Sequence, residues 1–244
     1  MHLRRLLSGI ERTRWYHPIH DAYLRTVKRR YWNDHVLGLR RFYRQFVSPG
    51  SLVFDVGANI GEYSRAFLDL GARVVAVEPT PELAASLKNI RGLVVENCAV
   101  ADKPGTMQFF VSSASHMNSL VPNWTALAAD HPVQTSSIEV EGTTLDRLIE
   151  KHGMPDFIKI DVEGYELPVL SGLSSYPRWL SFEFHSEASE QAIACISRFR
   201  NSKFSYFLGE EPQTLGEPVS PEAMIKIISH LPPKQFGDIF VTHR

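Results

Sequence analysis

The stretch from Ser51 to Gly61 constrains the fold more than any other part of the chain. It reads Ser-Leu-Val-Phe-Asp-Val-Gly-Ala-Asn-Ile-Gly, so a short run of apolar strand formers ends at Gly57, and a helix-compatible segment, residues 62–68, follows at once. A strand, a glycine turn and a helix open a βαβ unit, which presents backbone N–H groups to a ligand at the helix N-terminus. We expect Gly57 to let the backbone approach a ligand closely and Gly61 to let the helix pack tightly against the strand.

The turn lacks the Gly-x-Gly-x-x-Gly pattern of dinucleotide-binding proteins, because Asn59 stands where the second glycine would fall. Asp55 lies at the end of the strand, inside the turn. A carboxylate in this position suits a cationic ligand better than a pyrophosphate. A nicotinamide-dependent dehydrogenase is therefore the disfavoured alternative.

Short apolar strands alternate with helical segments along the rest of the chain. Further strands are expected at residues 73–78, 93–96, 156–161, 179–184, 204–208 and 238–242. Strands separated by helices pair in parallel through right-handed crossovers, which predicts an α/β fold. Residues 106–111 and 137–140 are expected to form an inserted antiparallel pair around a long loop that contains His116, Trp124 and His131. Loops of this length inside a compact domain are often functional.

The first 48 residues are predicted to be a basic helical extension, and residues 49–244 the main domain, with Pro49-Gly50 at the boundary. Residues 1–46 carry eleven Lys and Arg against three acids, a net charge of +8, whereas the remainder carries −9. Apolar residues recur at helical spacing between the arginines. Three interpretations stay open: a cap packed on the domain, an amphipathic surface for anionic membrane lipid, and a lid over an acidic or phosphorylated substrate.

The composition indicates a cytoplasmic protein. Cys98 and Cys195 lie in segments typical of a core, which favours reduced thiols. The chain has no apolar run of the roughly 18 residues that a membrane span needs, and its N-terminus has no signal-peptide pattern. The overall net charge of −1 predicts no DNA partner.

Acidic residues follow several of the expected strands: Asp55, Glu78, Asp161, Glu183 and, more weakly, Glu96. In an open α/β sheet, ligands bind outside the carboxyl ends of the strands, so we expect these acids to gather on one rim. Glu78 suits a bidentate acceptor of two ribose hydroxyl hydrogen bonds. It lies 17 residues after Gly61, close to the spacing of a ribose-binding acid.

Four segments in this order resemble the FkbM-type methyltransferases: Asp55-Val-Gly-Ala-Asn-Ile-Gly61, Glu78-Pro79, Asn97-Cys-Ala-Val-Ala-Asp102 and Lys159-Ile-Asp-Val-Glu-Gly-Tyr-Glu166. Two shorter segments support the resemblance, Thr144-Leu145-Asp146 and Glu183-Phe184-His185. The similarity spans roughly residues 51–241, and the Lys-Ile-Asp-Val-Glu-Gly block is its most specific part. Residues 1–46 lie outside it.

The resemblance implies S-adenosylmethionine (SAM) as the cofactor and the class I fold, a Rossmann-like sheet of seven mostly parallel strands with the last antiparallel. It also implies O-methylation of a hydroxyl on a sugar or glycan, a lipid-linked molecule or a polyketide-like small molecule. Matching motif positions place Asp55, Gly57, Asn59 and Gly61 at the amino-acid end of SAM. The same matching places Glu78 with Pro79 at the ribose, Asn97 and Ala99 beside the adenine, and Asp161 near the cofactor as well.

Methyl transfer to an alcohol needs alignment of the reactants and a way to deprotonate the acceptor. The candidate catalytic residues are Asp161, Glu183 and His185, and His185, with an unperturbed pKa of ~6.5, is the first choice for the base. A divalent cation, Mg²⁺ or Ca²⁺, held by Asp161 and Glu183 with Glu163 or His185, is the alternative. Catechol-type O-methyltransferases place a metal at the corresponding strand ends, but we assign no residue here as a metal ligand.

Two further functions stay open from the sequence. One is a SAM-binding module without catalysis that acts through its basic N-terminus. The other is a methyltransferase that acts on RNA or protein, although basic charge without a recognisable RNA-binding module is a weak signal.

Overall fold

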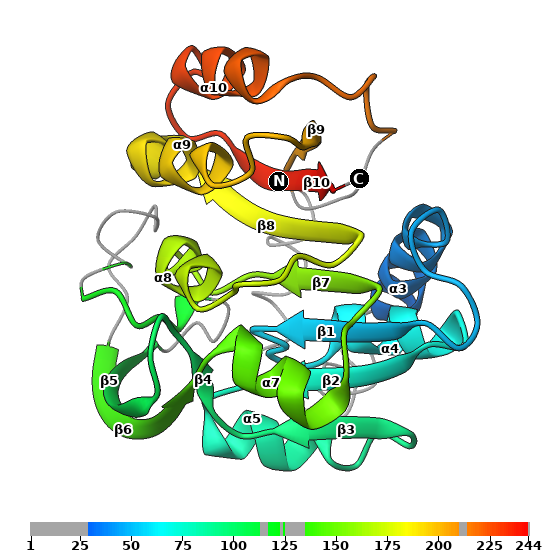
Figure 1. Cartoon of the computed structure of the whole chain (residues 1–244). Helices are drawn as coiled ribbons and strands as arrows, with labels where there is room; N and C mark the ends of the chain where they lie inside the picture. Colours follow the sequence, from blue (N-terminus) through cyan, green and yellow to red (C-terminus); the bar gives the residue numbers. More distant parts are fainter. Residues whose placement is uncertain (1–28, 113–116, 123, 125–134, 210–213, 244) are drawn as a thin grey trace, which may run out of the picture.

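A seven-stranded sheet forms the centre of the protein (Figure 1). The computed structural model describes residues 29–112, 117–122, 124, 135–209 and 214–243. The sheet has the strand order β3-β2-β1-β7-β8-β10-β9. Its strands, in chain order, are β1 (Leu52–Val56), β2 (Arg73–Val77), β3 (Leu93–Glu96), β7 (Phe157–Ile160), β8 (Trp179–His185), β9 (Lys203–Leu208) and β10 (Phe236–Thr242).

The pairing directions confirm the predicted class I sheet. Strands β3, β2, β1, β7 and β8 pair in parallel. Strand β10, the last along the chain, runs antiparallel to both of its neighbours, β8 and β9. The carboxyl ends of β1, β2, β7 and β8 therefore meet at one edge of the sheet, which is where the sequence places most of the candidate site residues.

Helices cover both faces of the sheet, because alternate side chains of each buried strand point to opposite faces. One face packs Phe54, Ile158 and Phe182 against α7 (Leu145–His152), α8 (Glu166–Ser171), α9 (Ser189–Ser197) and α10 (Pro221–Ser229). The other face packs Val53, Phe157 and Phe240 against α3 (Arg29–Tyr43) and α4 (Glu62–Asp69). The helix α5 (Pro81–Leu87) packs Leu87 against Ala76 of β2.

Helix α3 is the described part of the predicted basic extension. Its Leu39 and Tyr43 are fully buried, and Phe46, just after the helix, stacks on Phe157 and Phe240 of the sheet. The end of this segment thus shares the hydrophobic core of the main domain. The helices expected within residues 1–28 lie outside the described residues, and the boundary at residue 48 stays a prediction.

A second, three-stranded sheet is inserted after β3. It consists of β4 (Ala99–Val100), β5 (Gly105–Ser112) and β6 (Thr135–Thr143), and β5 and β6 pair antiparallel from Gly105–Gly142 to Ser112–Thr135. The predicted antiparallel insertion is therefore confirmed. His116 and His131 of the long loop lie outside the described residues.

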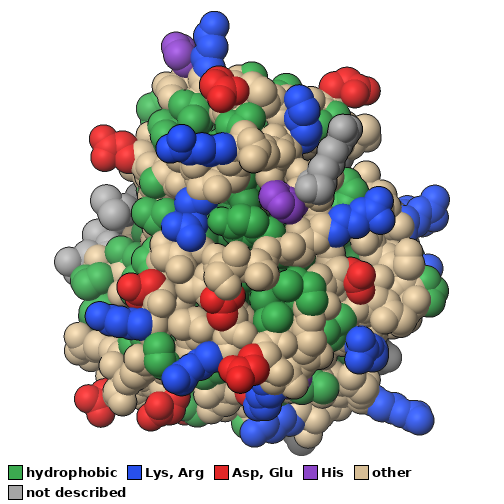
Figure 2. Space-filling model, in the orientation of Figure 1, with side chains coloured by type: hydrophobic (Ala, Val, Ile, Leu, Met, Phe, Trp, Pro, Cys, Tyr) green, Lys and Arg blue, Asp and Glu red, His purple; other side chains and the backbone are tan. Residues whose placement is uncertain are grey.

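Local sequence signals set the starts of two helices. The Thr144 hydroxyl caps α7 by accepting the Arg147 N–H at 3.2 Å, and the Ser220 hydroxyl caps α10, whose first residue is Pro221. Among the described helices, none is long and apolar enough to cross a membrane. Basic and acidic side chains are interspersed over the face of the molecule seen in Figure 2.

Candidate active site

Polar side chains form a layer near the carboxyl ends of the central strands. Asp55 lies beside Lys159 in the β1–β7 register, and Glu183 lies opposite Asp238 in the β8–β10 register. All four point to the face that α3 and α4 cover, since they alternate with residues of the opposite core. Asp161 follows β7 at the same edge, where its backbone N–H bonds the Val56 carbonyl at 2.9 Å.

The turn after β1 is built from left-handed residues, with φ of 86° at Gly57, 47° at Asn59 and 85° at Gly61. A Cβ at Gly57 would overlap the Asp161 carbonyl, so this glycine accommodates the backbone of the neighbouring strand. A Cβ at Gly61 would lie 2.7 Å from Leu87 Cδ2. The close packing at Gly61 is therefore with α5, and not with β1 as expected.

Asp55 is buried, and its carboxylate accepts a hydrogen bond from the Ser64 hydroxyl of α4. Burial raises the pKa of Asp55 to about 6, although the Ser64 hydrogen bond and the Lys159 charge act in the opposite direction. The turn thus contains a carboxyl group that a nearby positive charge would help to ionise.

Glu78 joins the end of β2 to the turn. Its Oε2 accepts the Asn59 N–H at 2.9 Å and its Oε1 accepts the Thr80 N–H at 2.8 Å. Burial raises the pKa of Glu78, and these hydrogen bonds partly offset the shift. Each carboxylate oxygen keeps a second lone pair for a ligand. The Asn59 Oδ1 is buried and has no hydrogen-bond partner among the described residues.

The residues expected near adenine are placed by different interactions. Asn97 Nδ2 donates to the carbonyls of Glu78 at 2.9 Å and Pro79 at 3.0 Å, and so fixes the loop after β2. Ala99 is buried in β4, where it packs in a cluster with Phe109 and Val140 of the inserted sheet.

Glu96 does not join the rim group that the sequence predicted. Its Oε1 lies 2.7 Å from Lys151 Nζ and 2.7 Å from His152 Nε2, both from the end of α7. The carboxylate is thus engaged by two basic side chains of a neighbouring helix. This pairing corrects the expectation that all five strand-end acids gather at one site.

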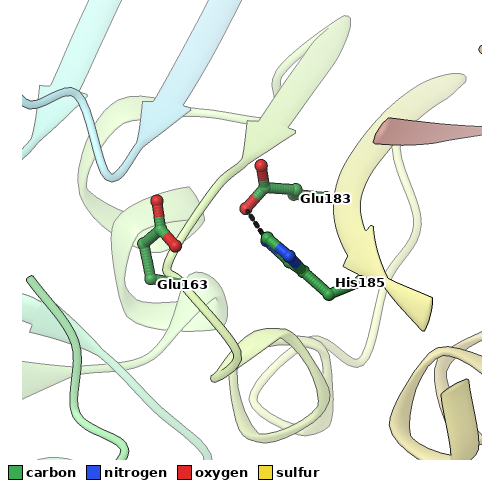
Figure 3. A group of neighbouring side chains, drawn as sticks. All are labelled: Glu163, Glu183 and His185. Atoms are coloured by element: carbon green, nitrogen blue, oxygen red, sulfur yellow. Dashed lines mark ion pairs between the residues drawn. The ribbon is translucent and has the colours of Figure 1, made fainter. Parts of the chain in front are cut away.

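Glu163, Glu183 and His185 converge at the ends of β7 and β8 (Figure 3). One ligand-type atom from each lies within 4.8 Å of the other two. The His185 Nε2 lies 3.4 Å from Glu183 Oε2, and neither atom has a hydrogen-bond partner among the described residues. The structure therefore brings together two of the three predicted catalytic residues, and adds Glu163 to them.

The electrostatics of this group differ from those of isolated side chains. Burial raises the pKa of Glu183 well above its usual value, and the nearby charges of Asp161 and Glu163 raise it further. Burial likewise raises the pKa of Glu163. Burial lowers the pKa of His185, which favours the neutral imidazole. A neutral imidazole can accept a proton.

Aromatic rings hold the His185 side chain. Trp124 meets it edge-on with ring centroids 5.0 Å apart, and Phe236 stacks on it at 5.6 Å. The Trp124 Nε1 donates to Glu163 Oε2 at 2.7 Å, and its ring occupies the space that a Cβ at Gly164 would need. These contacts hold Trp124 against the end of β7. A small cavity beside it is lined by Glu166, Glu183, His185, Gln191 and Cys195.

With this geometry in place, comparison with known proteins is informative. The family model described as the methyltransferase FkbM domain matches residues 55–230, which include the β1–α4 turn and the Glu183–His185 pair. The chain belongs to the FkbM methyltransferase family. The resemblance inferred from the sequence motifs is confirmed.

Two proteins with similar sequences have named activities. The hexuronic acid methyltransferase AglP of Haloferax volcanii is 32% identical over 137 residues, which cover 54% of this chain and 53% of that protein. The 31-O-demethyl-FK506 methyltransferase FkbM of Streptomyces tacrolimicus is 32% identical over 164 residues, covering 53% and 63%. The chain thus matches less than two thirds of the length of either relative.

Solved structures are more distant. A precorrin-6y C5,15-methyltransferase from Geobacter metallireducens superposes with a TM-score of 0.46 at 12% identity, covering 86% of both chains. A precorrin 8W decarboxylase from Methanobacterium thermoautotrophicum gives a TM-score of 0.45 at 9% identity, covering 84% of this chain and 89% of that one. Similarity at this level does not bear on the reaction of this FkbM family member.

The charge of Asp161 acts on both Glu183 and His185, and in this FkbM family member Asp161 also pairs with a lysine. The Lys159 Nζ lies 3.1 Å from Asp161 Oδ2 and 3.1 Å from Asp238 Oδ1. The roles of Lys159 and Asp238 were missed. A signal for Lys159 was present, because a lysine between two isoleucines of a buried strand needs charged partners.

Proposed function

We propose that the protein transfers a methyl group from SAM to a hydroxyl group of a sugar or glycan, a lipid-linked molecule or a polyketide-like small molecule. The observation that supports this most is the position of the His185 imidazole, whose Nε2 lies 3.4 Å from the partly buried carboxyl group of Glu183. His185 lies at the same edge of the sheet as the turn after β1 and Glu78 at the end of β2. This arrangement offers a cofactor-binding turn and a proton acceptor next to each other.

The turn between β1 and α4 fits the cofactor. The orphaned Asn59 Oδ1 and the spare lone pairs of Glu78 are acceptors that suit the ammonium and ribose hydroxyl groups of SAM. We assign Asp55, Gly57, Asn59 and Gly61 to the amino-acid end. Glu78 and Pro79 are assigned to the ribose, Asn97 and Ala99 to the adenine side, and Asp161 to the cofactor from the β7 end.

The surplus of buried and partly buried carboxyl groups fits a positively charged ligand. The pKa values of Asp55, Glu163 and Glu183 are raised because burial and mutual repulsion disfavour their charged forms. When bound, SAM supplies an electrophilic methyl group on a positively charged sulfonium. A cation bound at this edge would favour the ionised forms of these carboxyl groups, so the charge of the site complements the charge of SAM.

The base in this proposal is His185. Its Nε2 would take the proton of the acceptor hydroxyl as the hydroxyl oxygen gains the methyl group and the carbon–sulfur bond breaks, with S-adenosylhomocysteine as the leaving group. Glu183, 3.4 Å away, would stabilise the imidazolium. The rings of Trp124 and Phe236 keep the imidazole plane fixed during the transfer. A general base of this kind contributes about 10²- to 10⁴-fold to the rate.

The test is to incubate the full chain with methyl-labelled SAM and fractionated acceptors that include free sugars, uronic acids, glycans and polyketides. We expect label transfer with stoichiometric S-adenosylhomocysteine. The labelled product should withstand mild alkali, because a methyl ether survives treatment that hydrolyses a methyl ester. Label released as methanol would instead show methylation of a carboxyl group.

The same assay separates the alternatives. SAM binding without S-adenosylhomocysteine from any fraction would show a non-catalytic SAM-binding module. Label in material that ribonuclease or protease degrades would show an RNA or protein acceptor.

A divalent cation at Glu163, Glu183 and His185 is the second candidate for activating the hydroxyl, because their ligand atoms lie within 4.8 Å of one another. Activity that chelation abolishes and Mg²⁺ or Ca²⁺ restores would favour the cation over His185 as base. Activity unaffected by chelation would exclude it.

A further inference from the structure

The segment of residues 117–122 belongs to the insertion and lies at the carboxyl edge of the central sheet. The inserted sheet stands on the side toward which β1 and β7 run (Figure 1). Ser119 forms an antiparallel bridge with Phe110 of β5, with backbone hydrogen bonds of 2.8 and 3.0 Å. The backbone of the segment is thus fixed to the inserted sheet, and the side chains of Asn118 and Ser119 contact two different parts of the main domain.

The side chain of Asn118 contacts the loop after β2. Its Oδ1 accepts the Ser112 N–H of β5 at 2.7 Å, and its Nδ2 donates to the Thr80 hydroxyl at 3.3 Å. Thr80 is buried, and its own backbone N–H donates to Glu78 Oε1 at 2.8 Å. Asn118 therefore connects the inserted sheet to the loop that holds the carboxylate assigned to the ribose.

The side chain of Ser119 contacts the end of β7. Ser119 is buried, and its hydroxyl donates to the Glu163 carbonyl at 2.6 Å. Glu163 has a φ of 55°, a left-handed conformation that is uncommon for a residue with a side chain. The same peptide unit carries the Gly164 N–H, which donates to Glu166 Oε1 at 3.2 Å. Hydrogen bonds on both sides of this peptide thus hold the backbone that places the Glu163 carboxyl beside His185 (Figure 3).

We propose that Asn118 and Ser119 are positioning residues for the methyl transfer and that they act on opposite ends of the site. Asn118 fixes the Glu78 carboxylate for the cofactor through Thr80, and Ser119 fixes the Glu163 peptide next to the candidate base. The assignment rests on the proposed SAM-dependent function. An insertion that only stabilised the domain would affect both ends together, so separate effects of two adjacent residues distinguish positioning from general structural support.

The experiment compares Asn118→Ala and Ser119→Ala with a matched control, Gln108→Ala. Gln108 is exposed on β5, and its Nε2 donates to the Ser137 hydroxyl of β6 at 3.1 Å. The control therefore loses a side-chain hydrogen bond of the same inserted sheet without a change at the carboxyl edge. All chains are full length, and circular dichroism establishes that each is folded.

SAM affinity is measured by calorimetry, and kcat by S-adenosylhomocysteine formation in an acceptor fraction on which wild type is active. Asn118→Ala should bind SAM about 3- to 10-fold more weakly, the effect of one lost hydrogen bond, and should keep kcat within about twofold at saturating SAM. Ser119→Ala should keep its SAM affinity within about twofold and lose about tenfold or more in kcat, because the group beside the base is misplaced. Gln108→Ala should change neither. Equal losses in the two variants, or no loss in either, would overturn the proposal.

A double-variant comparison tests the connection through Thr80. Thr80→Val removes the hydroxyl that Asn118 contacts but keeps the backbone N–H that Glu78 accepts. Added to Asn118→Ala, it should weaken SAM binding by less than about twofold more, since both changes remove the same hydrogen bond. Losses that add in full would overturn the role of Asn118 through Thr80.

Amide hydrogen exchange of the ligand-free chain separates this inference from the proposed function. Asn118→Ala should speed exchange of the Thr80 N–H by about tenfold or more and leave the Gly164 N–H within about threefold, and Ser119→Ala should do the reverse. If wild type binds no SAM, the proposed function fails and these two rates decide the positioning roles. Equal acceleration at both amides, or none, would overturn them. If Ser119→Ala does not fold, Trp124→Phe replaces it, because it removes the 2.7 Å indole hydrogen bond to Glu163 Oε2 at the same end.

Discussion

The acidic groups at the two ends of the site differ in their hydrogen-bond partners. At the β1–β2 end, the carboxylates of Asp55 and Glu78 accept hydrogen bonds from a neighbouring hydroxyl and from backbone N–H groups. At the β7–β8 end, Glu183 Oε2 and His185 Nε2 face each other at 3.4 Å without a hydrogen-bond partner among the described residues. The carboxylates of the first end are thus held by hydrogen bonds, whereas the second end has a carboxylate oxygen and an imidazole nitrogen without one.

This difference separates binding from chemistry. Groups held by backbone hydrogen bonds are positioned before a ligand arrives, so they contribute to affinity with little reorganisation. Partly buried acidic and imidazole groups whose polar atoms have no hydrogen-bond partner are suited to proton transfer. We therefore expect changes at the first end to alter SAM affinity, and changes at the second end to alter turnover.

The largest expected effect is at the β7–β8 end. The variant His185→Gln should lower kcat by about 10²- to 10⁴-fold, because it removes the proton acceptor. The exposed His230 at the end of α10 gives the matched control, and His230→Gln should keep wild-type turnover. S-adenosylhomocysteine formation under saturating SAM measures both. A loss below threefold in His185→Gln would rule out His185 as the base.

A substitution where the β1–α4 turn contacts the end of β7 should disturb both ends of the site. The variant Gly57→Ala forces a side chain onto the Asp161 carbonyl at a φ of 86°, which should cost about 2–5 kcal/mol of unfolding free energy. Gly50→Ala has the same φ of 86° and no described atom within 4 Å of the added Cβ, so it should cost only about 1–2 kcal/mol. Urea unfolding compares them, and equal costs would contradict the steric account.

The β1–β2 end should respond in affinity. The variant Glu78→Gln should raise the KM for SAM about 10- to 100-fold, since it weakens charge-assisted hydrogen bonds, while kcat at saturation stays within threefold. Glu82→Gln, on the exposed first turn of α5, is the matched control and should leave KM unchanged. A Glu78→Gln variant that loses kcat with an unchanged KM would reverse the assignment of the two ends.

The smallest effect is on stability as a function of pH. Burial raises the pKa of Glu166 from 4.5 to about 7, so the folded chain binds more protons than the unfolded chain between these values. This contribution is fully present below pH 4.5 and is lost as the pH rises through about 7. Thermal melting of the ligand-free chain should show Tm falling by several degrees from pH 5 to 8, and falling less in Glu166→Gln. An equal fall of Tm with pH in wild type and Glu166→Gln would contradict the raised pKa of Glu166.

The sequence predicted the fold well because its signals are local. Strand lengths, glycine turns and the alternation with helices were enough to predict parallel pairing of the strands and the inserted antiparallel pair. An acid after a strand could likewise be placed at the carboxyl edge. The turn from Asp55 to Gly61 was recognisable because its residue types are tied to unusual backbone angles.

The partners of the acids could not be predicted, because they come from distant segments. Glu96 is paired with Lys151 and His152, which follow it in the sequence only after the whole inserted sheet, and Trp124 contacts Glu163 from the loop of that insertion. Side-chain pairing of this kind depends on three-dimensional packing, so it produces no characteristic spacing of residues in the sequence. The lysine in β7 showed that acids had to be near it, but not which ones.

Calorimetric titration of SAM into wild type, Glu78→Gln and His185→Gln tests the separation of binding from chemistry most directly. Wild type and His185→Gln should bind SAM with affinities within threefold of each other, in the micromolar range, and Glu78→Gln should bind at least tenfold more weakly. If all three chains bind equally, or if His185→Gln loses as much affinity as Glu78→Gln, the two ends of the site do not have separate roles.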